Sequence, residues 1–284
     1  MCRLLIYCYG IERNVVNAVI SKDGTKIAYQ TIGSGPAIIL IPGALAYAHN
    51  LEPLAEELSQ LFTLHVMERR GRGESGPQGE DYSIDKEVED LNAIQDKTKA
   101  EFVFGHSFGG FLALEAARDN QNFSKIAVYE PGVSISGSIN IGWIKRCQQE
   151  VSTSNYLDAF TTFVQGLNPK SSKMPHWLMK HILKIAIKNP ERQEKYPLLK
   201  GTIKEHKEEA RLNDTYPKYK EIPAAVLCMY GTKSGDTAKF TAIKLQEAIQ
   251  NVKAVAMPGF NHLAPEDKPQ RIAQELKEFF GQVS

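Results

Sequence analysis

The chain of 284 residues is 42% hydrophobic and 24% charged, an ordinary balance for a globular protein with a sizeable core. Its formal net charge is only +1, so no global electrostatic field would attract nucleic acid, and no nucleic-acid partner is expected. The cysteines are scattered and form no CxxC pair of the kind that binds zinc or exchanges disulfides. We therefore expect no metal site and unpaired thiols at Cys2, Cys8, Cys147 and Cys228.

The first ten residues have some features of a targeting signal. They carry Arg3 and a short apolar run over 4–9, with no clear small-residue cleavage site after it. No apolar stretch of the sequence reaches the roughly 18 residues that a membrane-spanning helix needs. We therefore expect a cytoplasmic protein without stable membrane insertion.

The first half of the chain alternates strand-like and helix-like patterns. The runs 15–20 and 26–32 flank an Asp-Gly pair, which tolerates positive φ and predicts an antiparallel hairpin. Strand–helix alternation after the hairpin predicts a mostly parallel sheet with helices on both faces. The further strands are expected over 37–41, 62–67, 102–104 and 125–129, and the helices over 51–61, 85–97 and 108–118.

The alternation stops near Pro131, and the stretch that follows shows mostly helical patterning broken by prolines. Strand-like runs return at 224–230 and 252–257, and an amphipathic helix over 269–280 closes the chain. We therefore predict an α/β core made of residues 1–131 and 223–284, interrupted by a helical cap over residues 132–222.

The segment Gly105–Gly109 (GHSFG) fits the GxSxG pattern, and it stands between a buried strand and a helix. On such a sharp turn the serine adopts a strained backbone conformation with its hydroxyl directed outward. Glycines flank the serine because a Cβ there would collide with the neighbouring strand or helix. The positive end of the following helix also favours developing negative charge. Ser107 is therefore the predicted nucleophile.

A serine hydroxyl is a weak nucleophile and needs a base within hydrogen-bond reach. In proteins with this strand–turn–helix motif the histidine comes last in the chain, and His262 lies in the loop between the last strand and the last helix. His262 is therefore the predicted base. The other histidines precede the nucleophile, adjoin it or lie in the helical stretch: His49, His65, His106, His176, His181 and His206.

Two carboxylates compete for the third position, where an acid holds the imidazole tautomer and stabilises the imidazolium. Glu130 follows the strand after the nucleophile, and Asp236 follows the next-to-last strand. Both would project at the carboxyl edge of the sheet, where ligands bind in open α/β folds. We favour Glu130, with Asp236 as the main rival.

An oxyanion hole needs two backbone N–H groups. One is expected from Phe108, the residue after the nucleophile. The other is expected from the loop after the strand 37–41. Ala44 is favoured there, because Gly43 permits a close turn that aims the next amide inward.

These motifs resemble those of the α/β-hydrolase superfamily, and the resemblance covers nearly the whole chain. Residues 105–110 (GHSFGG) resemble the family's nucleophile elbow, and 69–75 (RRGRGES) resemble its Arg-Gly-x-Gly-x-Ser loop. Residues 41–43 (IPG) stand where the family usually has His-Gly, and the helical insertion matches its cap only in kind. The resemblance implies a carboxylesterase-like serine hydrolase that acts on a small-molecule substrate without a cofactor.

The sequence departs from the family pattern at two positions. Glu68 replaces the aspartate that usually precedes the arginine loop. Ser234 stands three residues after Gly231, where the family's acid usually lies, so Asp236 would need a two-residue displacement. Some haloalkane dehalogenases place the acid after the preceding strand, which corresponds to Glu130. Those enzymes use an aspartate nucleophile, so a serine argues against dehalogenation and equally against epoxide hydrolysis.

The expected reaction is cleavage of an ester, thioester or activated C–C bond of a small or medium apolar substrate through an acyl-enzyme. A ligand-binding or receptor-like protein on the same fold is the alternative, and cofactor-free perhydrolysis is a variant of the enzyme hypothesis. Residues 71–76 fit GxGxxG, but Pro77 prevents the helix that would hold a pyrophosphate. The basic amphipathic segment 177–188 suits a cap helix over the pocket, or else a membrane surface. The sequence predicts no oligomeric state.

Overall fold

The structure is a computed structural model that describes residues 15–167 and 171–281. The apolar run over residues 4–9 lies outside the described residues, as do Cys2 and Cys8. Cys147 and Cys228 are free, buried thiols. Burial raises the pKa of each of these two thiols to about 12, so both stay protonated at neutral pH.

Within the described residues eight strands form one sheet, in the order β1-β2-β4-β3-β5-β6-β7-β8. The pairs β1–β2 and β2–β4 are antiparallel and the other neighbours are parallel, which confirms the predicted hairpin and the mostly parallel sheet. The strands are β1 Val15–Ile20, β2 Lys26–Gly33, β3 Ala37–Ile41, β4 Thr63–Met67, β5 Phe102–His106, β6 Lys125–Tyr129, β7 Ala225–Gly231 and β8 Val252–Met257.

Strand β5 runs two residues beyond its predicted end. The reason is its parallel partner β6, because Gly105 and His106 pair with Val128 and Tyr129. The added residues carry the strand up to Ser107, which the structure places at the carboxyl edge of the sheet.

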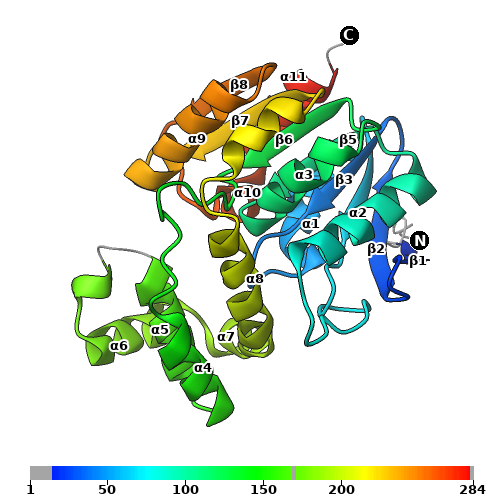
Figure 1. Cartoon of the computed structure of the whole chain (residues 1–284). Coiled ribbons are helices and arrows are strands. Elements are labelled where there is room, and N and C mark those ends of the chain that lie inside the picture. The colour runs from blue at the N-terminus through cyan, green and yellow to red at the C-terminus, as the bar shows by residue number, and fades with distance from the viewer. Residues whose placement is uncertain (1–14, 168–170, 282–284) are drawn as a thin grey trace, which may run out of the picture.

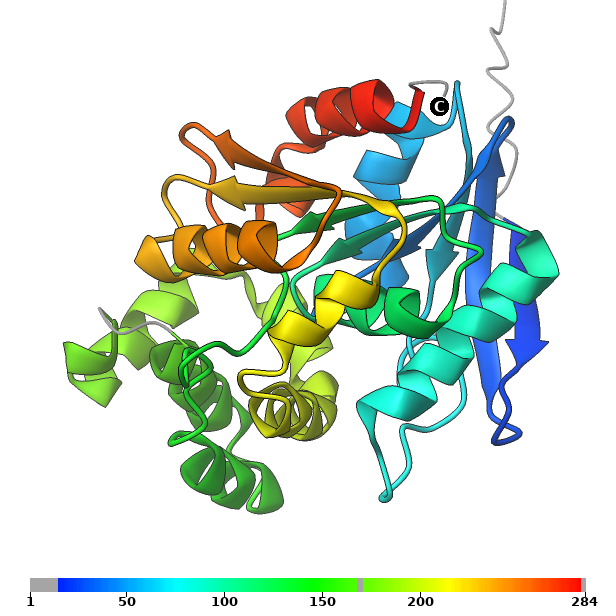
Figure 2. The same cartoon turned by 45° about the horizontal axis from the view of Figure 1, so that its top comes forward.

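Helices cover both faces of the sheet (Figures 1 and 2). Alternate residues of each central strand face opposite sides, so Ile39 packs with one set of helices and Leu40 with the other. Continuous apolar runs suit such doubly buried strands. One face carries α2 Ile84–Thr98, α3 Phe108–Asp119 and α9 Asp236–Ala248; the other carries α1 Glu52–Leu58, α10 Ala264–Asp267 and α11 Pro269–Gly281.

The chain between β6 and β7 folds into helices gathered at one end of the sheet (Figure 1). They share a core of their own that includes Trp143, Phe160 and Phe163. These helices are α4 Ile144–Ser152, α5 Tyr156–Leu167, α6 His176–Ala186, α7 Asn189–Lys195 and α8 Leu199–Arg211, and short 3-10 turns are η1 Ala48–Leu51, η2 Ser171–Lys173, η3 Tyr196–Leu198 and η4 Tyr216–Glu221.

Helix α6 corresponds to the basic amphipathic segment. It buries Met179 and Leu183 against the insertion's own core and leaves Trp177 and Ile185 exposed. None of the helices within residues 15–167 and 171–281 combines the length and the apolar character that crossing a bilayer requires.

Candidate active site

Ser107 joins β5 to α3 with φ 53° and ψ −118°, a conformation that L-residues rarely adopt. A Cβ on Gly105 would collide with the carbonyl of Gly109, and a Cβ on Gly109 would collide with the carbonyl of Ile41. The backbone N–H of Ser107 donates to the carbonyl of Tyr129 at 3.0 Å. Close packing of backbone on backbone thus holds the strained turn and explains why glycine stands on both sides.

Glu130 follows β6 and is buried, and each of its two carboxylate oxygens has a different partner. Oε1 accepts a hydrogen bond from the N–H of Gly231 at 2.8 Å. Oε2 lies 2.7 Å from Nδ1 of His262, whose side chain is half-exposed. Because a carboxylate accepts, Nδ1 of His262 carries the proton and its Nε2 presents a lone pair.

Asp236, the rival acid, begins α9 and is exposed. Within the part of the chain that the structure describes, no hydrogen bond or ion pair joins Asp236 to His262. The structure therefore brings Glu130, and not Asp236, to the histidine.

Two buried side chains, those of Tyr129 and His106, hold the loop of His262. Neither of them was predicted from the sequence to belong to the site. The Tyr129 hydroxyl donates to the carbonyl of Asn261 at 2.7 Å. Nε2 of His106 donates to the carbonyl of His262 at 2.8 Å, and the two imidazole rings lie 4.9 Å apart between centroids. Burial lowers the pKa of His106 to about 3, so the ring stays neutral and acts as a donor that positions the loop.

Ser107, Glu130 and His262 all line one cavity of about 470 Å³. No hydrogen bond between Ser107 and His262 is present among the described residues, although both face this space. The rest of the lining comes largely from the helical insertion, the turn before α9 and α9 itself, including Asn140, Leu167, His206, Glu209, Ser234 and Thr241. No tryptophan, phenylalanine or tyrosine is among the described residues that line this cavity, and Trp143, Phe160 and Phe163 pack in the insertion's own core instead.

His206 and Glu209 did not stand out from the sequence. A signal was present, because Thr202, His206 and Glu209 share one face of α8 at i, i+4 and i+7 spacing with buried apolar residues. Polar side chains at positions where a helix packs inward are candidates for a functional site, and these two residues line the cavity.

The loop after β3 borders the nucleophile, since a Cβ on Gly43 would stand 3.2 Å from the Cβ of Ser107. No group within the described ranges accepts a hydrogen bond from the N–H of Ala44. The N–H of Phe108 stands in the first turn of α3, where a helix leaves its amides without internal partners. Loop and helix thus contribute two N–H groups that remain available for an oxyanion.

Arg69 contacts both of these segments. Its Nη1 donates to the carbonyl of Gly43 at 3.1 Å, and its guanidinium lies 4.2 Å over the ring of Phe108. The side chain is fully buried, and its charge is balanced by Glu87, with two hydrogen bonds of 2.7 Å, and by Glu205 at 3.1 Å. A buried arginine therefore ties the loop after β3 to helices α2, α3 and α8.

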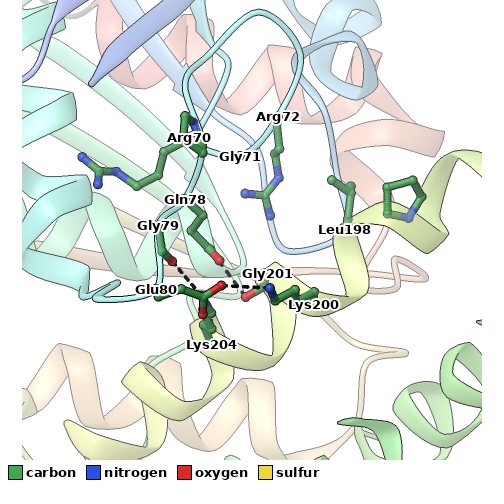
Figure 3. Close-up of a pocket in the computed structure, with 12 residues that line it drawn as sticks. Arg70, Gly71, Arg72, Gln78, Gly79, Glu80, Leu198, Lys200, Gly201 and Lys204 are labelled. Atoms are coloured by element: carbon green, nitrogen blue, oxygen red, sulfur yellow. Dashed lines mark hydrogen bonds and ion pairs between the residues drawn. The ribbon is translucent and has the colours of Figure 1, made fainter. Parts of the chain in front are cut away.

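A second cavity, of about 380 Å³, lies between the arginine loop and the start of α8 (Figure 3). Its cations are already paired with carboxylates, since Lys200 and Lys204 both contact Glu80 and Arg72 contacts Glu205. No helix begins between residues 71 and 83, as expected from Pro77. The lining of this cavity includes no predicted site residue. Among the described residues, no cluster of three or more His, Cys, Asp or Glu side chains could hold a metal ion.

Comparisons with known proteins agree with this architecture. Residues 38–275 match the model of the alpha/beta hydrolase family. The chain is 31% identical over 103 residues to the uncharacterized hydrolase YraK of Bacillus subtilis, and 31% identical over 129 residues to N-formylmaleamate deformylase of Pseudomonas putida. These matches cover 35% and 43% of this chain and only 38% and 48% of the relatives. The chain thus spans less than half the length of these curated relatives.

Solved structures match over nearly the full chain. An alpha/beta hydrolase from Sphaerobacter thermophilus is 30% identical, with a TM-score of 0.80 over 93% of this chain and 100% of that one. An esterase from Exiguobacterium antarcticum, 20% identical, has a TM-score of 0.70 over 94% and 100% of the two chains, a likeness of fold alone. The predicted fold and family are confirmed, and the chain belongs to the alpha/beta hydrolase family.

Proposed function

We propose that this protein is a carboxylesterase-like serine hydrolase that cleaves an ester, thioester or activated C–C bond of a small or medium-sized substrate through an acyl-enzyme. The observation that carries the proposal is the 2.7 Å hydrogen bond between Glu130 and His262, made at a cavity that Ser107 also lines. The strained serine turn and the family membership support the same reading. One relative is named a deformylase and one structure of this fold an esterase, and both activities are acyl transfers.

In this mechanism Glu130 keeps the proton of His262 on Nδ1, so that Nε2 accepts the hydroxyl proton of Ser107. The serine oxygen attacks the substrate carbonyl carbon, and the carbonyl oxygen becomes an anion. The N–H groups of Ala44 and Phe108 donate to that anion, and the positive end of α3 adds to its stabilisation.

The tetrahedral intermediate then collapses. The imidazolium of His262 gives its proton to the leaving group, the bond to that group breaks, and the acyl group stays on Ser107. Water repeats the sequence, with Nε2 taking its proton and returning it to the serine oxygen. The acid is released and the resting protonation states are restored.

We also propose that residues 132–222 act as a cap on a core made of residues 1–131 and 223–284. The support is that α4–α8 lie between β6 and β7 and that residues of this stretch, such as Asn140, Leu167 and Glu209, line the same cavity as Ser107. A substrate bound there would contact both parts.

The test is covalent labelling with a fluorophosphonate probe, together with turnover of 4-nitrophenyl acetate. We expect the wild type to be labelled and Ser107→Ala to be unlabelled, with kcat reduced about 1000-fold or more. Ser234→Ala, a change at another serine of the same cavity, is the matched control and should still be labelled. A folded wild type that takes no label and turns over no ester would refute the proposal and favour a ligand-binding protein on the same fold.

A further inference from the structure

Glu209 is a buried acid in the lining of the cavity, and it has no role in the proposed acyl-enzyme mechanism. Its side chain lies on α8, is only 3% exposed and lines the same cavity as Ser107. Its Oε2 has no hydrogen-bond partner among the described residues. Buried polar groups are almost always satisfied, so an unpaired carboxyl oxygen at a cavity points to a ligand group that completes it.

The carboxyl group of Glu209 lies close to the nucleophile. A Cβ on Gly132 would collide with Oε1 of Glu209, so the carboxyl group fills space that only glycine leaves open. The N–H of Gly132 in turn donates to the carbonyl of Ser107 at 3.0 Å. Gly132 alone therefore separates Glu209 from Ser107. A substrate held at Ser107 would lie within reach of the Glu209 carboxyl group.

His206 faces the same oxygen. Its Nδ1 lies 2.9 Å from the carbonyl of Thr202, which can only accept, so Nδ1 carries the proton and Nε2 presents a lone pair. Nε2 lies 3.8 Å from Oε2 of Glu209, too far for a direct hydrogen bond. Both residues line the cavity, so a small group there that contacts the imidazole and the carboxyl group could bond to both.

The protonation states suit an uncharged partner. Burial, reinforced by the charge of Glu205, raises the pKa of Glu209 well above its usual range, and burial lowers the pKa of His206. The raised pKa favours the protonated acid, which offers an O–H donor, and the lowered pKa favours the neutral imidazole, which offers an acceptor. A group that both accepts and donates, such as a hydroxyl, satisfies the two together.

The charge of the cavity favours the same class of ligand. Among the described residues that line it there is no lysine or arginine, while Glu130 contributes a carboxylate. An anionic substrate would therefore meet a negative charge without a counter-ion. The other polar lining groups are neutral, among them Ser138, Asn140 and Thr241.

We propose that Glu209 and His206 form a subsite that binds an uncharged hydroxyl group of the substrate, close to the bond that Ser107 attacks. The hydroxyl oxygen accepts from the acid of Glu209, and its proton is donated to Nε2 of His206. This proposal rests on the proposed hydrolase function and gives it a substrate class, namely acyl compounds that carry a hydroxyl group. Sites built to bond a hydroxyl discriminate strongly against analogues that lack one, because their own polar groups are then left unpaired.

The test compares matched 4-nitrophenyl esters that differ in a single group. Each series carries a hydroxyl, methyl, ammonium or carboxylate substituent at one position. In the first series the position is carbon 3 of a butyryl chain, and in the second it is the para position of a phenylacetyl group. Wild-type kcat/KM for the hydroxyl ester should exceed that for the methyl ester by about 10-fold or more in at least one series. Glu209→Leu should abolish this ratio, whereas Glu209→Gln, which still donates and accepts, should keep part of it.

Glu208→Gln is the matched control. Glu208 neighbours Glu209 on α8 but bonds to Arg211 and is not part of the cavity lining, so the ratio should stay at the wild-type value. Should Glu209→Leu fail to fold, His206→Leu tests the other half of the pair by the same ratio.

The subsite is refuted if the wild type shows no hydroxyl preference in either series, if it prefers the ammonium or carboxylate esters, or if the folded variants keep the full ratio. Failure of the hydrolase function looks different. In that case no ester of either series is cleaved and the fluorophosphonate does not label Ser107.

Discussion

Glu130 and His262 stand 132 positions apart in the chain, yet Oε2 of the first lies 2.7 Å from Nδ1 of the second. The other carboxylate oxygen accepts from the N–H of Gly231, so the carboxylate is oriented from both sides. An amide at this position could not satisfy both partners in the same way, because only one of its two ends accepts.

This orientation predicts the effect of Glu130→Gln. The amide oxygen of the introduced glutamine would accept from the N–H of Gly231. The NH₂ group would then face His262 and require a lone pair on Nδ1. The proton then moves to Nε2, and the ring can no longer accept from Ser107. We expect kcat for 4-nitrophenyl acetate to fall about 1000-fold or more. Asp236→Asn should stay within about twofold of wild type, and the opposite ranking of the two variants would assign the acid to Asp236.

Arg69→Lys tests the proposed role of the loop after β3, which contains Gly43 and Ala44, in binding the oxyanion. Lysine keeps the charge but loses the planar group that donates to Gly43 and stacks on Phe108. Misplacing either N–H group should lower kcat of the folded enzyme about 10- to 100-fold, with little change in KM. Arg70→Lys is the control, since Arg70 is equally buried but bonds to Asp90 and Asp23. Equal losses of kcat in the two variants would show that the loss comes from general destabilisation.

Gly109→Ala tests the close packing behind the nucleophile. The added methyl would meet the carbonyl of Ile41, so backbone must shift to admit it. We expect a loss of at least about 1–3 kcal/mol in the free energy of unfolding, measured by urea denaturation. Gly281→Ala adds the same methyl at the exposed end of α11, where no described atom outside the helix's own backbone lies within 4 Å, and should change stability by less than about 0.5 kcal/mol. A stable, fully active Gly109→Ala would mean that the turn is less tightly packed than described.

The low pKa of the buried His106 predicts that the free energy of unfolding depends on pH. Its pKa is about 3 in the folded protein, against an ordinary value of 6.5, so the unfolded chain binds the proton more readily. The stability that the neutral ring contributes is complete above pH 6.5 and is lost as the pH falls from there toward 3. Between pH 7.5 and 5.5 this single group should lower the free energy of unfolding by about 1 kcal/mol.

His106→Gln keeps a side-chain donor for the carbonyl of His262 but does not titrate. Urea denaturation at the two pH values should therefore show a smaller pH-dependent loss in this variant than in wild type. His65 and His206, whose pKa values burial also lowers, are present in both proteins and do not affect the difference. Equal losses in the two proteins would contradict the prediction.

The strands and the serine turn were predictable because their causes are local. Apolar runs such as Ala37–Ile41 must be buried on both faces, and Gly105 is required by its contact with Gly109 one turn away. The end of β5 was less predictable, since its last two residues pair with β6 and Gly105 also pairs with Ile41 of β3. Pairing partners depend on the register of the whole sheet.

The identity of the carboxylate beside His262 could be favoured but not decided from the sequence. Both Glu130 and Asp236 follow strands at the same edge, and the choice depends on how the last loop turns. That turn is held by Tyr129 and His106, whose contacts with residues 261 and 262 bridge more than 130 positions. Glu209 was missed because its helix pattern is that of any packed amphipathic helix, and only the cavity distinguishes it.

The order of the strands in the sheet has a consequence for synthesis on the ribosome. Ser107 and Glu130 end neighbouring central strands, whereas His262 follows β8, the strand at the outer edge. A nascent polypeptide can complete the centre of the sheet long before its final segment emerges. If His262 is the base, hydrolytic activity is acquired only when β8 and the loop after it have docked against the centre of the sheet.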